Sequence, residues 1–469
     1  MPKKYHIDTK KVAPRLPKIG KFGVVDWRED CARCHNCVKK ACVYDRYRQE
    51  TQYIKDMEEF NAMFFECMGC FSCVQRCTKG ILALTVNPEY ARMGNGYYTP
   101  DIILTTWNQA ETASIPVSGA GYRGRFTGPG FDAMWTDMSE IVRPTRDGIH
   151  GREYISTSVD IGRKPKFLAF DCDQLTTTLS PLVDLPAPII IDMLPEKYHF
   201  KNLVPMMLSV AVKTGTMLIV DWKHEAQLGH GKEKHLSQII YYVDNETPLP
   251  PPETLRQLRL IEIAEGDNAE ERIQQIKAVN PNLVVAIRLT LDAYGEGRAI
   301  ALAQRPNVEV IHLVADMNGN QIGVETPKFI KEMTRSIHTA LVKNGVRDEI
   351  TLIAGGGIAL AEHMAKEIIC GADAITIDLP LLISLECRMC SSCRDGFACP
   401  AKIDHITTEY GVGRMTNLLA VWHDQLIEMM GAMGMREARR LRGETGRALF
   451  FEDLEEETFG RLFGTRITV

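Results

Sequence analysis

Short apolar segments alternate with amphipathic segments between residues 180 and 380. Eight apolar segments have the length and flanking residues of β-strands: 188–192, 217–221, 239–243, 259–263, 283–288, 308–314, 350–354 and 373–377. Amphipathic helices are predicted at 199–213, 268–278, 325–344 and 360–370. Eight strands with intervening helices predict an α/β fold, a (β/α)8 TIM-type barrel. An open doubly wound sheet is the competing fold.

The alternation of apolar and amphipathic segments stops on both sides of this region, which predicts further domains and connecting segments there. We expect an N-terminal arm at 1–27, a small domain at 28–90, an ordered Arg/Gly-rich connector at 91–180, the barrel at 181–406 and a C-terminal helical segment at 407–469. Val24–Trp27 and Ile81–Val86 are candidate short strands of the small domain, and the charged segment 44–62 is predicted to be helical. Aromatic residues in the connector argue against disorder there.

Composition limits the cellular location and the classes of binding partner that we expect for this protein. The chain has 469 residues, 45% hydrophobic and 25% charged, with a net charge of −5. This balance gives no electrostatic reason to expect nucleic acid or membrane-surface binding. The longest uncharged apolar run, near 202–212, is too short to span a bilayer. The N-terminus lacks the apolar core of a secretory signal, and closely spaced thiols suit a reducing compartment, so we expect a cytoplasmic protein.

Eight of the fourteen cysteines form two tight quartets near the N-terminus. The quartets are Cys31, Cys34, Cys37 and Cys42, spaced C-x2-C-x2-C-x4-C, and Cys67, Cys70, Cys73 and Cys77, spaced C-x2-C-x2-C-x3-C. Thiolates three residues apart on a curled loop converge on one point, as an iron–sulfur cubane requires. Structural zinc also binds C-x2-C pairs, but it has no use for a third cysteine at the same step. The quartets therefore predict two [4Fe–4S] clusters and electron transfer.

These quartets resemble those of a bacterial-type ferredoxin with two clusters. In that family the fourth cysteine of each run ligates the other cluster. The resemblance implies that Cys77 joins Cys31, Cys34 and Cys37, and that Cys42 joins Cys67, Cys70 and Cys73. Val43 and Thr78 stand where the family has proline, and the first run has one extra residue.

A third group of cysteines follows the last predicted strand in the sequence LECRMCSSCRDGFACPAK. Its members are Cys387, Cys390, Cys393 and Cys399. Barrel enzymes build their sites at the C-terminal ends of their strands, which is where this segment begins.

This segment resembles the FMN-binding barrel of glutamate synthase, in which a C-x5-C-x4-C-P motif holds a [3Fe–4S] cluster. Cys387, Cys393 and Cys399 match that motif with one extra residue in the second gap, followed by Pro400. Cys390 has no counterpart and either completes a [4Fe–4S] cluster or is a bystander. Residues 277–281, 310–325 and 338–359 are similar to further family segments. With the leading cysteine quartets, the chain resembles the compact, archaeal-type version of this protein.

The resemblance also implies a flavin site and substrate-binding residues. Gly355, Gly356 and Gly357 match the family's phosphate loop and would let backbone N–H groups face an FMN phosphate. Asp378 replaces a family glycine beside the phosphate, and its carboxylate would repel a dianion. Arg288 replaces the family's strand-five lysine and is a candidate for catalysis and cofactor binding. Asp316 is a catalytic candidate and Asn318 a cofactor-binding one, although capping of the next turn is an alternative for both.

Other residues carry weaker expectations. Lys223, Arg143, Arg146 and Arg152 are further candidates for holding substrate carboxylates, with structural ion pairs as the alternative for the arginines. His312 is expected to pack inside the barrel. Cys172 and Cys370 are expected to be buried small hydrophobic residues.

Three functional hypotheses follow. The first is a ferredoxin-linked, FMN-dependent oxidoreductase that makes glutamate from 2-oxoglutarate. The second is a flavin and iron–sulfur subunit of a larger redox complex with another small-molecule substrate, and the third a flavin-free iron–sulfur relay. The sequence has no G-x-G-x-x-G fingerprint after a predicted strand, and we find no glutaminase domain in it. We therefore expect a multi-subunit complex with a ferredoxin or other redox-protein partner, and with a separate glutaminase or NAD(P)H-oxidising subunit.

Overall fold

The computed structural model describes residues 5–17, 19–26, 34, 38–43, 69–115, 128–136, 154–177, 179–195, 198, 200, 202–229, 231–390, 392–393 and 397–464. The chain divides into two compact units. The barrel unit contains residues 1–12, 108–385 and 403–469, and the cysteine unit contains residues 13–107 and 386–402. Within the described ranges, no helix is long and apolar enough to cross a membrane.

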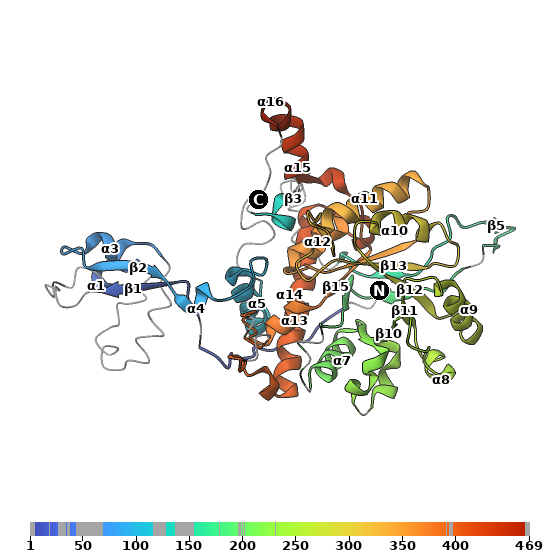
Figure 1. Cartoon of the computed structure of the whole chain (residues 1–469), viewed down its shortest axis with the longest axis horizontal. Helices are drawn as coiled ribbons and strands as arrows, with labels where there is room; N and C mark the ends of the chain where they lie inside the picture. The colour runs from blue at the N-terminus through green and yellow to red at the C-terminus, as the bar shows by residue number, and fades with distance from the viewer. Residues whose placement is uncertain are drawn as a thin grey trace. The chain divides into compact units, whose positions relative to one another are not determined.

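The barrel unit is built around a closed barrel of eight parallel strands (Figure 1). The strands are β8 (Ile189–Ile191), β9 (Leu218–Asp221), β10 (Ile239–Val243), β11 (Leu260–Ala264), β12 (Val284–Thr290), β13 (Val310–Val314), β14 (Thr351–Gly355) and β15 (Ala374–Ile377). Each strand pairs with the next along the chain, and β15 closes the barrel by pairing with β8. The (β/α)8 prediction is confirmed, and the open sheet is excluded.

Helices surround the barrel because the segments between the strands carry one apolar face. The principal helices are α7 (Leu203–Thr214), α8 (Pro252–Leu255), α9 (Ala269–Val279), α10 (Gly295–Ala303), α11 (Ile330–Lys343), α12 (Ala361–Cys370) and α13 (Leu379–Ser384). In α11 the buried residues Ile330, Met333, Ile337 and Leu341 recur at three- and four-residue steps, which places them on one face. The four predicted helices correspond to α7, α9, α11 and α12. Two 3-10 segments, η7 (Trp222–Leu228) and η8 (Lys232–Gln238), replace a regular helix between β9 and β10.

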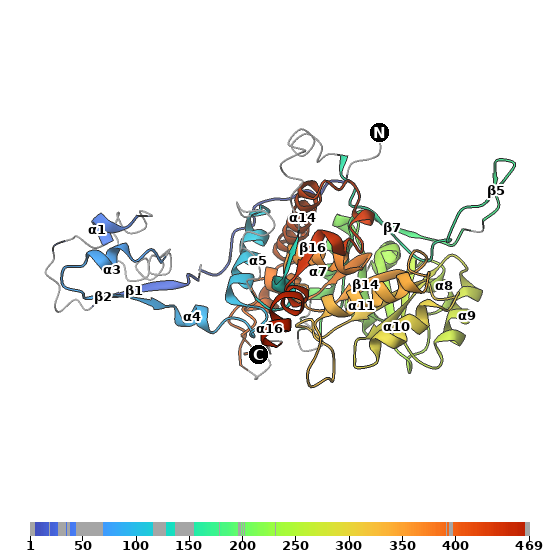
Figure 2. The same cartoon turned by 90° about the horizontal axis from the view of Figure 1, so that it is seen from above.

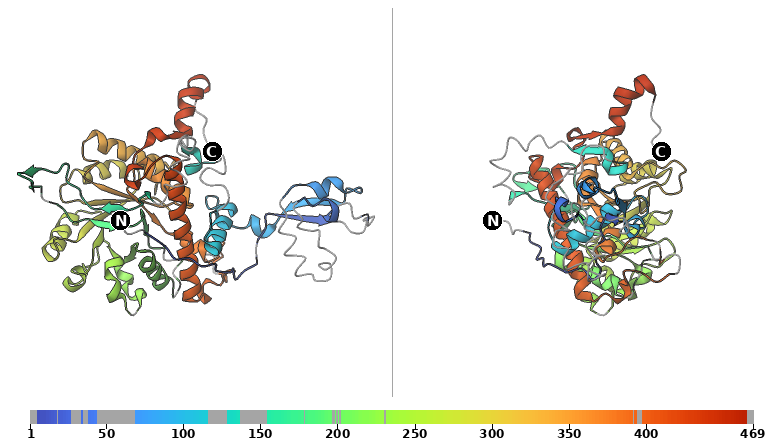
Figure 3. Two further views of the ribbon diagram at one scale, coloured as in Figure 1. Left: turned by 180° about the vertical axis from the view of Figure 1, so that it is seen from behind. Right: turned by 90° about the vertical axis from the view of Figure 1, so that its left-hand side faces the viewer.

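A long helix, α14 (Thr408–Ala432), packs against α7, α12 and α13 on the barrel unit (Figure 3). It begins where the Thr407 hydroxyl accepts the N–H of Tyr410. The buried Asn417 amide donates to the carbonyls of Lys10 and Ala110, so α14 also holds the first residues of the chain. Beyond α14 lie β16 (Ala448–Phe450), α15 (Phe451–Leu454), the π-helical segment η12 (Glu455–Gly460) and α16 (Arg461–Phe463).

The predicted connector contributes small sheets to the barrel unit. Strand β3 (Met134–Thr136) follows the 3-10 turn η3 (Gly130–Ala133) and pairs with β16, and β4 (Val159–Ile161) pairs with β7 (Val183–Leu185). Between β4 and β7, β5 (Phe170–Asp171) and β6 (Gln174–Leu175) form a hairpin that projects from the barrel (Figure 2). Cys172 lies at the turn of this hairpin with a φ of 45° and is exposed, so the prediction that it is buried was wrong. Cys370 is buried, as expected.

The cysteine unit contains a two-stranded antiparallel sheet. β1 (Phe22–Asp26) pairs with β2 (Leu82–Val86), with Phe22 opposite Val86 and Asp26 opposite Leu82. Around it lie α1 (Val38–Ala41), α3 (Ser72–Arg76), α4 (Pro88–Ala91) and the first part of α5 (Pro100–Thr112). Sequence periodicity did not reveal α5. The predicted helix at 44–62 lies outside the described residues.

Candidate functional site

An ion pair crosses the inside of the barrel from one wall to the other. Arg288 on β12 donates from both terminal nitrogens to the carboxylate of Asp192, with both distances 3.1 Å. Asp192 directly follows β8, which lies diametrically opposite β12 in the strand order. Burial is the largest single influence and raises the pKa of Asp192, but the neighbouring charges and hydrogen bonds, those of Arg288 foremost, together outweigh it and hold that pKa below its usual value. Arg288, predicted to hold a substrate or cofactor, thus already holds a carboxylate of its own chain.

Neighbouring strands extend this pair into a buried network. Glu262 on β11 lies 3.3 Å from Arg288 Nη1, and its other oxygen lies 2.6 Å from Nδ1 of His312 on β13. Nε2 of His312 lies 3.3 Å from the Thr376 hydroxyl, which donates to Asp192 at 3.2 Å. Glu262 and His312 are each 1% exposed. His312 therefore packs inside the barrel, as expected, but as part of a polar network.

The loop after β14 is shaped by its three glycines. Gly356 and Gly357 have φ values of 96° and 71°, which favour glycine, and a Cβ on Gly357 would lie 2.4 Å from the Cα of Gly319. These residues therefore pack directly on the loop that follows β13. The N–H groups of Gly356 and Ile358 have no acceptor among the described residues. Two such donors ahead of the N-terminus of α12 fit a phosphate group.

The predicted residues Asp316 and Asn318 lie in the neighbouring loop after β13. One carboxylate oxygen of Asp316 accepts the backbone N–H groups of Asn318 and Asn320, both at 2.8 Å. The turn-capping alternative thus describes what the Asp316 carboxylate does here. Both side chains are partly exposed.

Asp378 directly follows β15 and is the N-cap residue of α13, where it is partly buried. Burial, together with the nearby charge of Asp192, raises the pKa of Asp378 to about 7. Near neutral pH this carboxyl group is therefore protonated in a large share of the molecules. A protonated carboxyl group donates a hydrogen bond and does not repel an anion.

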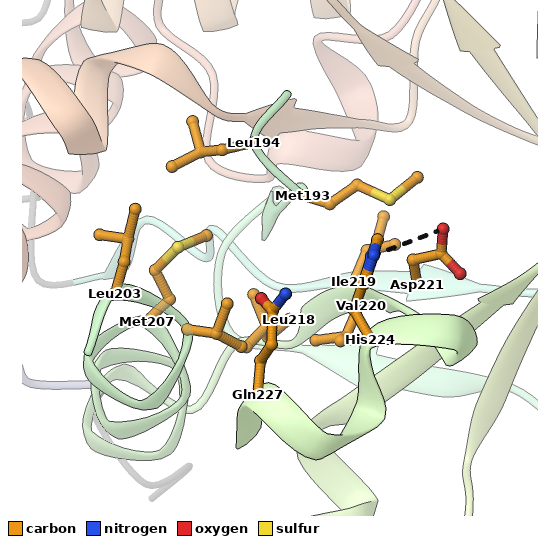
Figure 4. A pocket seen from close by; sticks show the side chains of 11 residues that line it. Met193, Leu194, Leu203, Met207, Leu218, Ile219, Val220, Asp221, His224 and Gln227 are labelled. Atoms are coloured by element: carbon orange, nitrogen blue, oxygen red, sulfur yellow. Dashed lines mark ion pairs between the residues drawn. The ribbon is translucent and has the colours of Figure 1, made fainter. Parts of the chain in front are cut away.

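A cavity opens at the ends of β8 and β9, beside α7 (Figure 4). Its empty volume is about 510 Å³, part of which is open to solvent. The wall is apolar, with Met193, Leu203, Met207 and residues of β9 among its lining, while Asp221, His224 and Gln227 supply polar groups. His224 Nδ1 lies 3.9 Å from the Asp221 carboxylate. An apolar cavity with a few polar groups at the strand ends suits a small organic ligand.

Of the other side chains predicted to hold substrate carboxylates, only Lys223 lies among the described residues. Lys223, just after β9, is paired with Asp244, and this contact together with the Thr247 hydroxyl holds the pKa of Asp244 below its usual value. Arg143, Arg146 and Arg152 lie outside the described residues.

Asp132, Glu362 and His363 form a further polar group at the start of α12, with side-chain donor atoms within 4.8 Å of one another. His363 Nδ1 accepts the N–H of Ala359, so the neutral ring carries its proton on Nε2 and can donate it to a carboxylate. A metal-bound histidine instead donates from its other nitrogen. We therefore interpret this group as a cap for α12.

The third cysteine loop lies in the cysteine unit and starts two residues after α13 ends. Cys387 is buried, Cys390 and Cys399 are partly buried, and Cys393 is exposed. Burial raises the pKa of the Cys387 thiol to about 12, and the other three cysteines add to that shift, so they lie close to it. A group of neighbouring thiols with one buried member fits a metal centre, because metal ions favour the thiolate form.

The N-terminal quartets are described in part. Cys31, Cys37 and Cys67 lie outside the described residues. Cys34 Sγ lies 3.6 Å from the hydroxyl of Thr78, the residue after Cys77. Cys70 accepts hydrogen bonds from Ser72 and from the backbone of Val43, the residue after Cys42, which lower its pKa. Each quartet thus approaches the far end of the other, as the crossed ligand assignment requires.

Sequence reasoning missed Asp192, Glu262 and Thr376, and it did not select Asp221 or His224. Only their positions in the sequence could have pointed to them, because each lies within or just after a barrel strand. A polar residue in an apolar strand faces the barrel interior or a ligand, and the sequence alone does not show which.

Comparisons with known proteins show which proteins this chain is similar to in sequence. A family described as the conserved region in glutamate synthase matches residues 251–436. The archaeal-type glutamate synthase (NADPH) of Dehalococcoides mccartyi is 25% identical over 90% of this chain and 93% of its own length. Over about nine-tenths of its length, the chain is therefore similar to archaeal-type glutamate synthases.

A second relative and one solved structure are also similar to this chain. The archaeal glutamate synthase (NADPH) of Archaeoglobus fulgidus is 22% identical over 93% of this chain and 96% of its own length. The match to a mandelate oxidase crystal structure covers 66% of this chain and 97% of the other, with 14% identity and a TM-score of 0.36.

Replacing Arg288 with methionine in this glutamate synthase-like protein should lower the free energy of unfolding by about 3–5 kcal/mol. Asp192 and Glu262 would then remain buried without their cation. The control is Lys223→Met, which breaks an exposed pair and should have little effect. Denaturant unfolding followed by circular dichroism measures both, and equal losses would contradict a supporting role for the network.

Proposed function

We propose that this protein is an iron–sulfur flavoprotein oxidoreductase that passes electrons between ferredoxin-type clusters and FMN. In the reaction we favour, 2-oxoglutarate and ammonium take up an electron pair and protons to give glutamate and water. A bound flavin would supply the conversion between one-electron carriers and two-electron chemistry.

The observation that carries the proposal is the grouping of the cysteines. All three cysteine groups belong to the cysteine unit, although Cys77 and Cys387 are far apart in sequence. The contacts from Cys34 to Thr78 and from Cys70 to Val43 support two clusters with crossed ligands. Three clusters in one unit would form a path for single electrons.

Flavin binding is assigned to the ends of the barrel strands. The N–H groups of Gly356 and Ile358 would receive the phosphate, and the cavity beside Met193 and Asp221 is a candidate place for part of the ring system. Asn318 remains a candidate for a hydrogen bond to the cofactor, and Asp316 a candidate for catalysis through its partly exposed carboxylate. Arg288 would not contact the cofactor in this arrangement. It would hold Asp192 and Glu262 in place inside the barrel, beneath the proposed flavin site.

The source of electrons is a partner protein in this proposal. The relatives are named for NADPH, which this chain would use only through a separate NADPH-oxidising subunit. Reduced ferredoxin, or a similar redox-protein subunit, would deliver electrons directly to the cysteine unit.

One observation favours the second hypothesis, a redox subunit with a different substrate. A dicarboxylate needs cations to receive it. Arg288 already holds Asp192 and Glu262, and Lys223 holds Asp244. If these pairs persist during turnover, neither Arg288 nor Lys223 would be available to bind the carboxylates of 2-oxoglutarate.

Anaerobic purification followed by flavin and iron analysis separates these hypotheses. We expect a releasable yellow cofactor and about eleven to twelve irons per chain. Absence of flavin leaves only the iron–sulfur relay. Glutamate formation from 2-oxoglutarate, ammonium and reduced ferredoxin supports the first hypothesis, and a silent assay with all cofactors in place supports the second.

FMN should bind most tightly below pH 7 and more weakly as the pH rises to 8.5. Asp378 loses its proton as the pH passes its pKa of about 7, and its charge then opposes the phosphate, by up to about tenfold in Kd per pH unit. The phosphate itself stays largely dianionic across this range. Fluorescence titration of the apoprotein measures the effect, and Asp378→Asn should remove it. A native affinity that does not change with pH would contradict this role of Asp378.

A further inference from the structure

The third cysteine loop is closed by a single residue from the start of the cysteine unit. Glu386 directly precedes Cys387 and is 1% exposed. Its carboxylate accepts the backbone N–H groups of Arg15 and Leu16, at 2.8 and 3.3 Å, and lies 3.3 Å from Nε of Arg15. The loop therefore begins at an ion pair whose carboxylate is buried and whose guanidinium is partly exposed.

Arg15 also holds the other end of the loop. Its guanidinium donates to the carbonyl of Ala401 at 2.6 Å and reaches that of Lys402 at 3.5 Å. Glu386 and Lys402, which bound the loop, have φ values of 70° and 46°. Such values are costly for residues other than glycine and persist where other contacts hold the backbone in place.

The charges of this pair are well placed to act on a cluster. Glu386 is adjacent to Cys387 in sequence, and its carboxylate is 1% exposed, so solvent screens this charge weakly. The Arg15 side chain, 27% exposed, lies at the edge of the same pair. A cluster gains negative charge when it is reduced. A nearby cation therefore stabilises the reduced form, and a nearby anion destabilises it.

We propose that the Arg15–Glu386 ion pair closes the third cysteine loop and sets the reduction potential of the cluster that this loop holds. This inference rests on the proposed function, because it requires a cluster at Cys387–Cys399. In the native protein the two charges offset each other beside the cluster. Arg15 and Glu386 are positioning residues. They would act on the cluster through the backbone of the loop and through the electric field of their own charges.

The test is a redox titration of the purified protein followed by electron paramagnetic resonance. The signal that disappears in Cys393→Ala identifies the third cluster. Arg15→Gln leaves Glu386 uncompensated and should shift that signal to a more negative potential. Glu386→Gln leaves Arg15 uncompensated and should shift it to a more positive potential, and the double variant should return towards the native value.

Two controls separate charge from scaffolding. Arg15→Lys keeps the charge and should stay near the native potential. Lys21→Gln removes the same charge from an exposed pair with Asp101 in the same unit and should cause no shift. Iron analysis of every variant shows whether the cluster is retained.

Shifts in the same direction, or no shift with the cluster retained, would overturn the inference and leave the proposed function intact. Loss of the third cluster from both single variants and from the double variant would make the pair a scaffold only, which also overturns it. A native protein with about eight irons and no signal lost in Cys393→Ala would overturn both the inference and the three-cluster proposal.

Discussion

The ion pair between Arg288 and Asp192 fixes how the barrel can be used. It joins β12 to the end of β8, on opposite sides of the barrel, and Glu262, His312 and Thr376 complete a network that fills the interior with polar contacts. Breaking such a buried pair would leave uncompensated charges inside the protein. A ligand of the barrel must therefore bind above this network, at the strand ends where the Gly355–Gly357 loop, Asp378 and the cavity beside β9 lie.

The path of the chain links this barrel to the cysteine unit. The chain leaves the barrel unit after α13, forms the loop that contains Cys387 to Cys399, and returns at Ile403 shortly before α14. The loop thus belongs to the same unit as the N-terminal cysteines while being covalently joined to the last strand and helix of the barrel. An electron path through iron–sulfur clusters to a flavin is the arrangement that this connectivity suits.

Local patterns predicted much of this fold, and contacts distant in sequence were not predicted. The strands were visible because each is a short apolar run, and the cysteine groups because their spacing is regular. The partner of Arg288 was not visible, since Asp192 lies 96 residues away and meets it only when the barrel closes. Glu386 and Arg15 are 371 residues apart, and nothing in either local sequence connects them. Helix α5 was missed because its apolar residues were read as part of an irregular connector.

In the proposed function, electrons reach the flavin through the third cysteine loop. The most direct test follows flavin absorbance after Cys393→Ala protein is mixed anaerobically with a one-electron donor. Cys172→Ala, which changes an exposed thiol on the β5–β6 hairpin, is the matched control. Our account predicts that the N-terminal clusters are reduced in both variants, while the flavin stays oxidised only in Cys393→Ala. Flavin reduction at the native rate in Cys393→Ala would contradict it.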